Sequence, residues 1–224
     1  MFLALEPRIL LDAAGAALLA DVIAETLSDS NHADVAAEPE VVDPVAEVKS
    51  VAAPLAITDT TTTRREIAVV DASVPDAESL VAGLPSSVEV IRIDGNSSGL
   101  DQLDAALAGQ HDIDAIHIFS HGAAGAFSLG SEIISKETIE EYSPRLSSIG
   151  HALKVDADIL LYGCNIGQDG AFAERLGELT HADVAVSVDA TGSSRFGGDW
   201  DLEFRVGDID ARIVENSTYS FLLG

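Results

Sequence analysis

Short apolar runs alternate with amphipathic segments along most of this chain, from Glu66 onward. The runs are rich in Ile, Leu and Val and are bounded by Gly or Asp, a pattern typical of buried strands in a parallel sheet. They predict strands at 67–70, 88–93, 115–119, 159–162 and 184–188. Apolar positions spaced three or four residues apart predict helices at 75–82, 99–108, 144–153 and 170–179.

The alternation of strands and helices predicts the fold class. Strands joined by helical crossovers can be parallel neighbours, so we expect an α/β three-layer sandwich with a mostly parallel sheet. Residues 127–134 are typical of a hairpin. Residues 197–206 alternate apolar and charged side chains and predict a C-terminal antiparallel edge strand. Ser143 and Pro144 suit the N-cap and first position of the third helix.

The first 65 residues are organised differently. Residues 1–27 contain a predicted amphipathic helix from Asp12 to Leu27, which carries too many acidic residues to span a membrane. Residues 28–65 hold three prolines and no aromatic residue, which predicts a disordered linker that closes with Arg64-Arg65. The folded domain is therefore expected at 66–224.

Charge narrows the set of partners. The chain has 38 acidic and 12 basic residues, with a net charge of −26. Such a surface repels phosphate backbones and anionic lipids, so we expect no nucleic acid partner and no membrane insertion. A small-molecule-binding domain of the flavodoxin type is a weaker alternative. The glycine loop that would cradle a phosphate is replaced by Asp71-Ala-Ser-Val-Pro, and we expect no cofactor.

Two strands of the predicted sheet end in reactive side chains, His121 and Cys164. If the strands are parallel neighbours, both side chains lie at the carboxyl edge, where α/β sheets bind ligands. A cysteine thiolate can act as nucleophile with the histidine as its base, and the amides of Gly122 and Cys164 could hold an oxyanion. The alternative is that Cys164, the only cysteine, simply packs in the core. One Cys and one His do not supply four ligands, so we predict no metal.

The segments Phe-Ser-His121-Gly and Leu-Leu-Tyr-Gly-Cys164-Asn resemble the motifs of the caspase-like cysteine peptidases, which include caspases, legumains and gingipains. The resemblance implies a caspase-like sheet and a Cys–His endopeptidase acting on proteins or peptides, its own chain among them. It also implies that Asp71 and Asp189 contribute to the substrate pocket. Carboxylates there would favour cleavage after Arg or Lys, and Arg64-Arg65 is a candidate site for self-cleavage.

A second resemblance covers residues 66–206. The motifs around Asp71, His121, Cys164 and Trp200 are similar to an uncharacterised bacterial domain family found near the N-termini of giant repeat-rich surface proteins and adhesins. This resemblance implies type I secretion and an extracellular or cell-surface location. The function expected from it is that of an N-terminal module of a large exported surface protein, acting as a Cys–His endopeptidase or self-processing domain. The alternative is a non-catalytic module of the same fold that acts in secretion, retention or adhesion.

Overall fold

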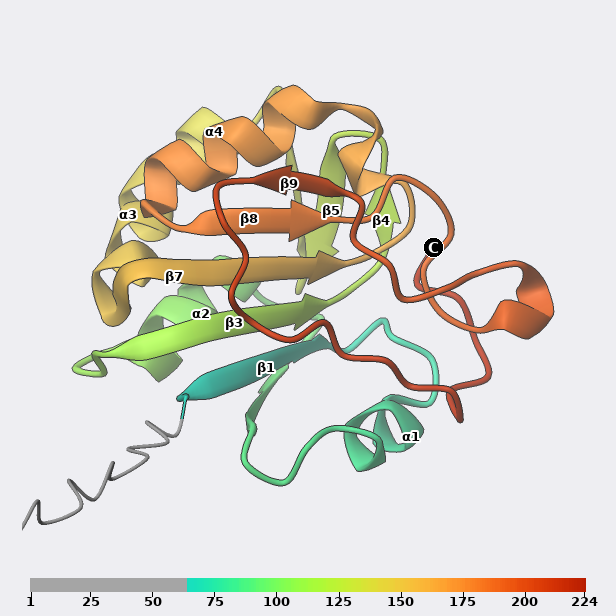
Figure 1. Cartoon of the computed structure of the whole chain (residues 1–224). Coiled ribbons are helices and arrows are strands. Elements are labelled where there is room, and N and C mark those ends of the chain that lie inside the picture. The colour runs from blue at the N-terminus through green and yellow to red at the C-terminus, as the bar shows by residue number, and fades with distance from the viewer. Residues whose placement is uncertain (1–63) are drawn as a thin grey trace, which may run out of the picture. The chain divides into compact units, whose positions relative to one another are not determined.

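A six-stranded sheet forms the centre of the domain in the computed structural model, which describes residues 64–224 (Figure 1). The strand order is β2–β1–β3–β7–β8–β9, and all neighbours are parallel except β9, which is antiparallel to β8. The strands are β1 (Glu66–Asp71), β2 (Glu89–Ile93), β3 (Ile113–Phe119), β7 (Leu153–Tyr162), β8 (Asp183–Val186) and β9 (Phe204–Val206). The predicted α/β fold, with its mostly parallel sheet and antiparallel edge strand, is confirmed. The predicted segment 1–27 and nearly all of the linker lie outside the described residues.

Two apolar layers enclose the sheet. The helices on one face are α2 (Gly99–Leu107), α3 (Ser143–Ala152) and α4 (Gly170–Thr180). The opposite face is covered by α1 (Ala77–Ala82) and by irregular chain before and after β9, of which the part after β9 crosses the front of the sheet in Figure 1. The second outer layer therefore consists mainly of irregular chain, held by buried side chains such as Trp200, Val214 and Tyr219.

Local sequence explains where the helices begin. Ser98 caps α2 by accepting a hydrogen bond from the Asp101 amide, and Asp169 caps α4 through the Ala171 amide. The predicted cap of α3 is wrong. Tyr142 precedes this helix, and the Ser143 hydroxyl instead donates to the Glu140 carbonyl at 2.7 Å. The reason is a 3₁₀ turn, Ile139–Tyr142, which runs directly into α3 and leaves no extended cap residue.

Two strands differ in length from their predictions. β7 begins at Leu153, where we expected a helix to end, and it runs for ten residues with an irregularity opposite β3. β9 is only three residues long, because Trp200 and Leu202 pack onto the sheet face without pairing as a strand. The predicted hairpin is confirmed by the antiparallel β5 and β6, and a two-residue strand β4 extends it. These strands are β4 (Gly122–Ala123), β5 (Ala126–Leu129) and β6 (Glu132–Ser135).

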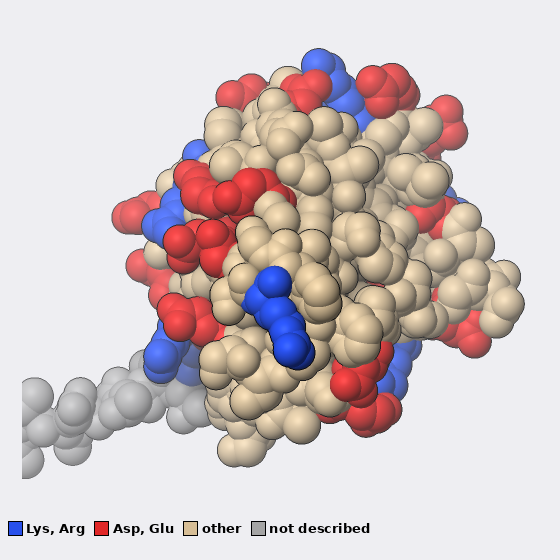
Figure 2. All heavy atoms as spheres, turned by 90° about the vertical axis from the view of Figure 1, so that its right-hand side faces the viewer, with Lys and Arg blue, Asp and Glu red and all other residues tan. Residues whose placement is uncertain are grey.

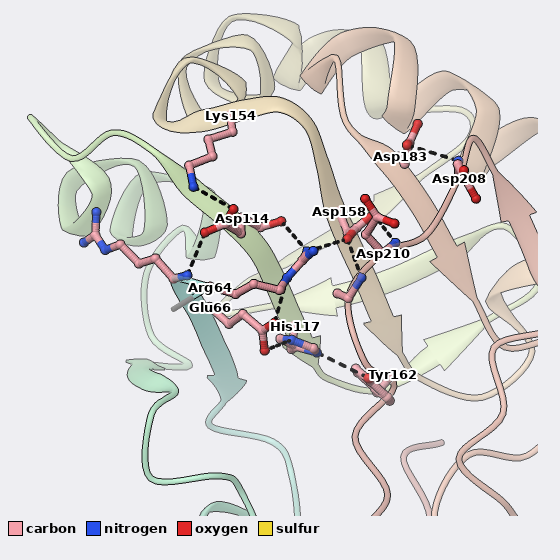
Figure 3. A network of polar contacts seen from close by, with 12 residues as sticks. Arg64, Glu66, Asp114, His117, Lys154, Asp158, Tyr162, Asp183, Asp208 and Asp210 are labelled. Atoms are coloured by element: carbon pink, nitrogen blue, oxygen red, sulfur yellow. Dashed lines mark hydrogen bonds and ion pairs between the residues drawn. The ribbon is translucent and has the colours of Figure 1, made fainter. Parts of the chain in front are cut away.

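A polar network joins the amino edge of the sheet to the chain after β9 (Figure 3). Arg64 donates to the carboxylate of Asp158 at 3.0 Å and to the carbonyl of Asp114 at 3.3 Å. Asp158 also accepts from the Ala211 amide at 2.7 Å. Desolvation raises the pKa of Asp158 in spite of these donors. Arg64 and Arg65 thus already belong to the folded structure, since the Arg65 amide donates to Asp114 at 2.7 Å.

Helices in the described part of the chain are all too short or too polar to cross a membrane.

Candidate active site

His121 and Cys164 follow adjacent parallel strands. Phe119 at the end of β3 pairs with Tyr162 at the end of β7, so both loops leave the sheet at its carboxyl edge. The loops touch each other, because a Cβ added to Gly122 would lie 2.6 Å from the carbonyl oxygen of Cys164. A glycine at 122 therefore allows the two backbones to approach.

The ring of His121 is oriented by the turn after β1. Its Nε2 lies 3.0 Å from the carbonyl oxygen of Ser73. A carbonyl can only accept, so Nε2 carries the proton, and in the neutral ring Nδ1 has a free lone pair. Nδ1 is buried and has no hydrogen-bond partner among the described residues. Nδ1 is therefore the basic nitrogen of the ring, but among the described residues it makes no hydrogen bond to the Cys164 thiol, whose polar contacts are with Thr191.

The Cys164 thiol lies against the loop after β8. Its Sγ accepts from the amide of Thr191 at 3.3 Å and lies 3.8 Å from the Thr191 carbonyl oxygen. The residue is only 5% exposed. The amide and the carbonyl of a single residue, Thr191, thus fix the position of the sulfur.

Two backbone amides beside the thiol bind one carbonyl oxygen. The Gly122 amide donates to the Leu223 carbonyl at 3.2 Å, and the Cys164 amide donates to the same oxygen at 2.9 Å. Leu223 belongs to the C-terminal end of the chain, which lies beside the carboxyl ends of the central strands in Figure 1. Two amides converging on one oxygen form the arrangement that stabilises an oxyanion in acyl transfer.

Asp71 has contacts that support the turn holding His121. Its carboxylate is 1% exposed and accepts from the amides of Ser73 at 2.9 Å and Gly130 at 2.6 Å. The Ser73 hydroxyl donates to it as well. Asp71 therefore acts on the position of Ser73, whose carbonyl orients the His121 ring.

Asp189 lies in an exposed acidic group. Its carboxylate, that of Asp199 and that of Glu203 have oxygens within 4.8 Å of one another. Desolvation, followed by the charge of Asp199, raises the pKa of Asp189. Exposed acidic groups of this kind are common without a bound ion, and the polar contacts of the Cys164 thiol are with Thr191, not with the Asp189 carboxylate.

The candidate self-cleavage site Arg64-Arg65 lies far from this geometry. Both residues immediately precede β1 at the amino edge of the sheet, whereas the Cys164 thiol lies at the carboxyl edge. Within one molecule the thiol cannot reach that peptide bond. The sequence reasoning also missed Ser73, Thr191 and Leu223. The only signal for Leu223 was the apolar character of residues 219–224.

A family model described as "Domain of unknown function (DUF4347)" matches residues 67–221. The chain belongs to this family. The matched region contains His121, Gly122 and Cys164 and ends at Phe221, immediately before the residues that lie against the thiol. No curated protein matches the chain.

The carboxyl edge of the DUF4347 domain faces the viewer in Figure 2. Much of that surface is uncharged, but a basic side chain lies near its middle, and acidic and basic side chains lie around its margin. A shallow hollow of about 180 Å³ lies beside His121 and is lined by Gly122, Phe127 and Ile133 among others. Ile133 is 68% exposed there. An uncharged, partly apolar surface suits the side chains of a neutral peptide better than those of a charged one.

Proposed function

We propose that the DUF4347 domain is a cysteine endopeptidase of the caspase-like type, with Cys164 as nucleophile and His121 as general base and then general acid. The observation that carries the proposal is the pair of amides, from Gly122 and Cys164, that donate to one carbonyl oxygen beside the thiol. The substrate is a protein or peptide, and the chemistry needs no metal and no cofactor.

Acylation begins when Nδ1 of His121 takes the thiol proton of Cys164. The resulting thiolate attacks the carbonyl carbon of the substrate, and the carbonyl oxygen becomes an oxyanion held by the two amides. Removing one such donor in related chemistry costs about 3 kcal/mol, or a factor of 10² to 10³ in rate. His121 then gives its proton to the leaving amine as the C–N bond breaks, which leaves a thioester on Cys164.

Deacylation repeats the sequence with water. His121 accepts a proton from the water that attacks the thioester, and the amides again hold the oxyanion. The thioester bond then breaks, and the sulfur of Cys164 takes the proton. The Ser73 carbonyl holds the ring in one tautomer through both steps, because it can accept only from Nε2.

The wider role that we propose is that of a module in a large exported bacterial surface protein. It rests on the sequence resemblance to domains of giant adhesins, which implies type I secretion and an extracellular location. The net charge of −26 suits such a setting and disfavours nucleic acid and anionic membranes as partners.

A non-catalytic module of the same fold is the second candidate. The observation that favours it is the 5% exposure of Cys164, with the C-terminal residues lying against the thiol. In that case the contacts at the carboxyl edge serve only to hold the chain together, and the module acts in secretion, retention or adhesion.

Labelling with a neutral peptide that carries a thiol-reactive electrophile separates the two candidates. Labelling is irreversible, so labelled protein accumulates even if the C-terminal residues cover the thiol for part of the time. A peptidase should label on Cys164, and His121→Ala should slow labelling by about 10²-fold or more, since general-base catalysis is typically worth that much. The readout is intact mass against time at neutral pH.

The controls are Cys164→Ala, which should not label, and His151→Ala, which removes an exposed histidine from α3 and should label like the wild type. Equal labelling rates for the wild type and His121→Ala would refute the peptidase and favour the non-catalytic module.

A further inference from the structure

We propose that the substrate of this site is the chain's own C-terminal segment, residues 220–224, cut between Leu223 and Gly224. The inference rests on the proposed peptidase function and adds to it the bond, the residue preference and the intramolecular course of the reaction. The segment already lies in the site as a peptide substrate would, and its backbone, side chain and leaving residue each support this assignment.

The backbone of the segment is bound as an added strand. The Leu223 amide donates to the Thr191 carbonyl at 2.9 Å, and the Ser193 amide donates to the Phe221 carbonyl at 2.9 Å. Between them, Gly192 and Leu222 form an antiparallel bridge. Peptides that bind to exposed strand edges use this same main-chain pairing. It fixes the register of the segment, so that the next carbonyl along the chain, that of Leu223, falls at the amides of Gly122 and Cys164.

Thr191 links the bound segment to the nucleophile. Its amide donates to Sγ of Cys164 at 3.3 Å, while its carbonyl accepts from the Leu223 amide. The residue that holds the sulfur is therefore the one that holds the residue before the scissile bond. In a peptidase this arrangement places the thiolate and the carbonyl that it attacks relative to each other.

Only one side chain of the segment is enclosed. Leu223 is 0% exposed and lies in the apolar cluster that also contains Val70, Phe119 and Trp200. By contrast, Phe221 is 41% exposed and Ser220 is also exposed. The site therefore selects the residue before the cut, and it selects an aliphatic one. An Arg, Lys or Asp at this position would bring a charge into an apolar enclosure without a partner.

The residue after the cut must be small. A Cβ added to Gly224 would lie 2.6 Å from Sγ of Cys164 and 2.8 Å from its Cβ. Glycine alone avoids this overlap while Leu223 stays in place. The geometry thus predicts Leu–Gly as the preferred dipeptide, in place of cleavage after Arg or Lys as Asp71 and Asp189 had suggested.

The reaction balances within the molecule and one water. Cys164 forms a thioester with the Leu223 carbonyl carbon, the bond to the Gly224 nitrogen breaks, and that nitrogen takes the proton held by His121. Water then releases Leu223 as a carboxylic acid and restores the thiol. Until the new end dissociates, the segment occupies the site and competes with any other substrate.

The test uses the full chain extended after Gly224 by a small reporter domain. The reporter should be released with Gly224 as its new N-terminal residue, at a first-order rate that does not change with protein concentration. Cys164→Ala should release none, and it should remain uncut when mixed with active chains. Release by the Cys164→Ala chain alone, or a cut at another bond, would overturn the inference.

Three variants test the residue preference. Leu223→Arg should slow release by at least about 10-fold, as expected for loss of an apolar pocket contact, whereas Leu223→Met should stay close to the wild type. Ser220→Arg changes an exposed residue of the same segment and should have no effect. If Leu223→Arg fails to fold, Gly224→Val replaces it and should slow release as well, because Gly224 is itself exposed but its new Cβ would meet the Cys164 thiol. Release from both Leu223→Arg and Gly224→Val at the wild-type rate would refute the assignment.

Labelling with the electrophilic peptide distinguishes failure of the self-cleavage inference from failure of the proposed peptidase function. If Cys164 labels in a His121-dependent manner but no reporter is released, the self-cleavage inference fails and the peptidase stands. If neither labelling nor release occurs, both fail.

Discussion

The substitution of Asp71 separates two roles for this carboxylate. If Asp71 recognises a basic residue of the substrate, Asp71→Ala should change the cleavage preference. The structure instead directs it at the amides of Ser73 and Gly130, so we expect Asp71→Ala to loosen the turn whose carbonyl orients His121. The preference for leucine should not change, while the labelling rate of Cys164 should fall.

The size of the effect follows from the burial of each donor. The Gly130 amide is partly buried and loses its partner, at a cost of about 1–3 kcal/mol. Ser73 is exposed, so water replaces part of what its amide loses, at about 0.5–1 kcal/mol. The free energy of unfolding should therefore fall by roughly 1.5–4 kcal/mol, and Asp71→Asn, which keeps an acceptor, should lose less.

Urea unfolding of the wild type, Asp71→Ala and Asp71→Asn gives the stability series, and the electrophilic peptide gives the labelling rates under conditions where all three are folded. As a matched control, Asp76→Asn neutralises an exposed carboxylate near the same turn and, because asparagine tolerates the positive φ of this position, should change neither quantity. A shift of cleavage preference in Asp71→Ala, with unchanged stability, would refute the positioning role.

Two further predictions concern the amino edge of the sheet (Figure 3). Asp158→Ala should lower the free energy of unfolding by about 2–4 kcal/mol, because the Ala211 amide and Arg64 lose a buried partner. Asp158→Asn should lower it less. Urea unfolding that gives the same loss for both variants would contradict this prediction. Contact with His117 lowers the pKa of Glu66 against the opposing desolvation, so its stabilisation is present above its ordinary pKa of 4.5 and is lost as the pH falls further. Glu66→Gln should thus be less stable than the wild type at about pH 6 and converge with it near pH 3, and a constant difference in thermal unfolding would disprove this.

The parts of the fold that sequence predicted well are those decided by burial over a few residues. The apolar runs that became β1, β3 and β8 and the spaced leucines of α2 need no partner to be recognised, because their pattern reports the buried side directly. The same rule fails for β9. Trp200 and Leu202 alternate as a strand does, yet their apolar side chains pack onto the sheet while their backbone pairs with no strand.

The candidate site, too, has features that the sequence could predict and features that it could not. The placement of His121 and Cys164 at one edge of the sheet could be predicted, because each follows a recognisable strand and the ends of parallel neighbours meet at the same edge. The role of Asp71 could not be read, because it depends on Gly130, which lies 59 residues away in the sequence. The position of Leu223 depends likewise on distant backbone groups of Gly122 and Cys164. A hydrogen bond between backbone groups that are far apart in the sequence leaves no local sequence pattern by which it could be predicted.

The amides at the thiol also explain why a segment of the chain should occupy the site at all. Two donors that converge in a nearly buried position are costly to leave without an acceptor, at about 1–3 kcal/mol each. The Leu223 carbonyl removes that cost during folding, and the enclosed leucine side chain adds apolar burial to the same contact. A site that can stabilise an oxyanion thus folds most readily around a carbonyl of its own chain. If the domain is the proposed peptidase, its first turnover is intramolecular, and the rate at which residues 220–223 leave the site sets its activity toward any other substrate.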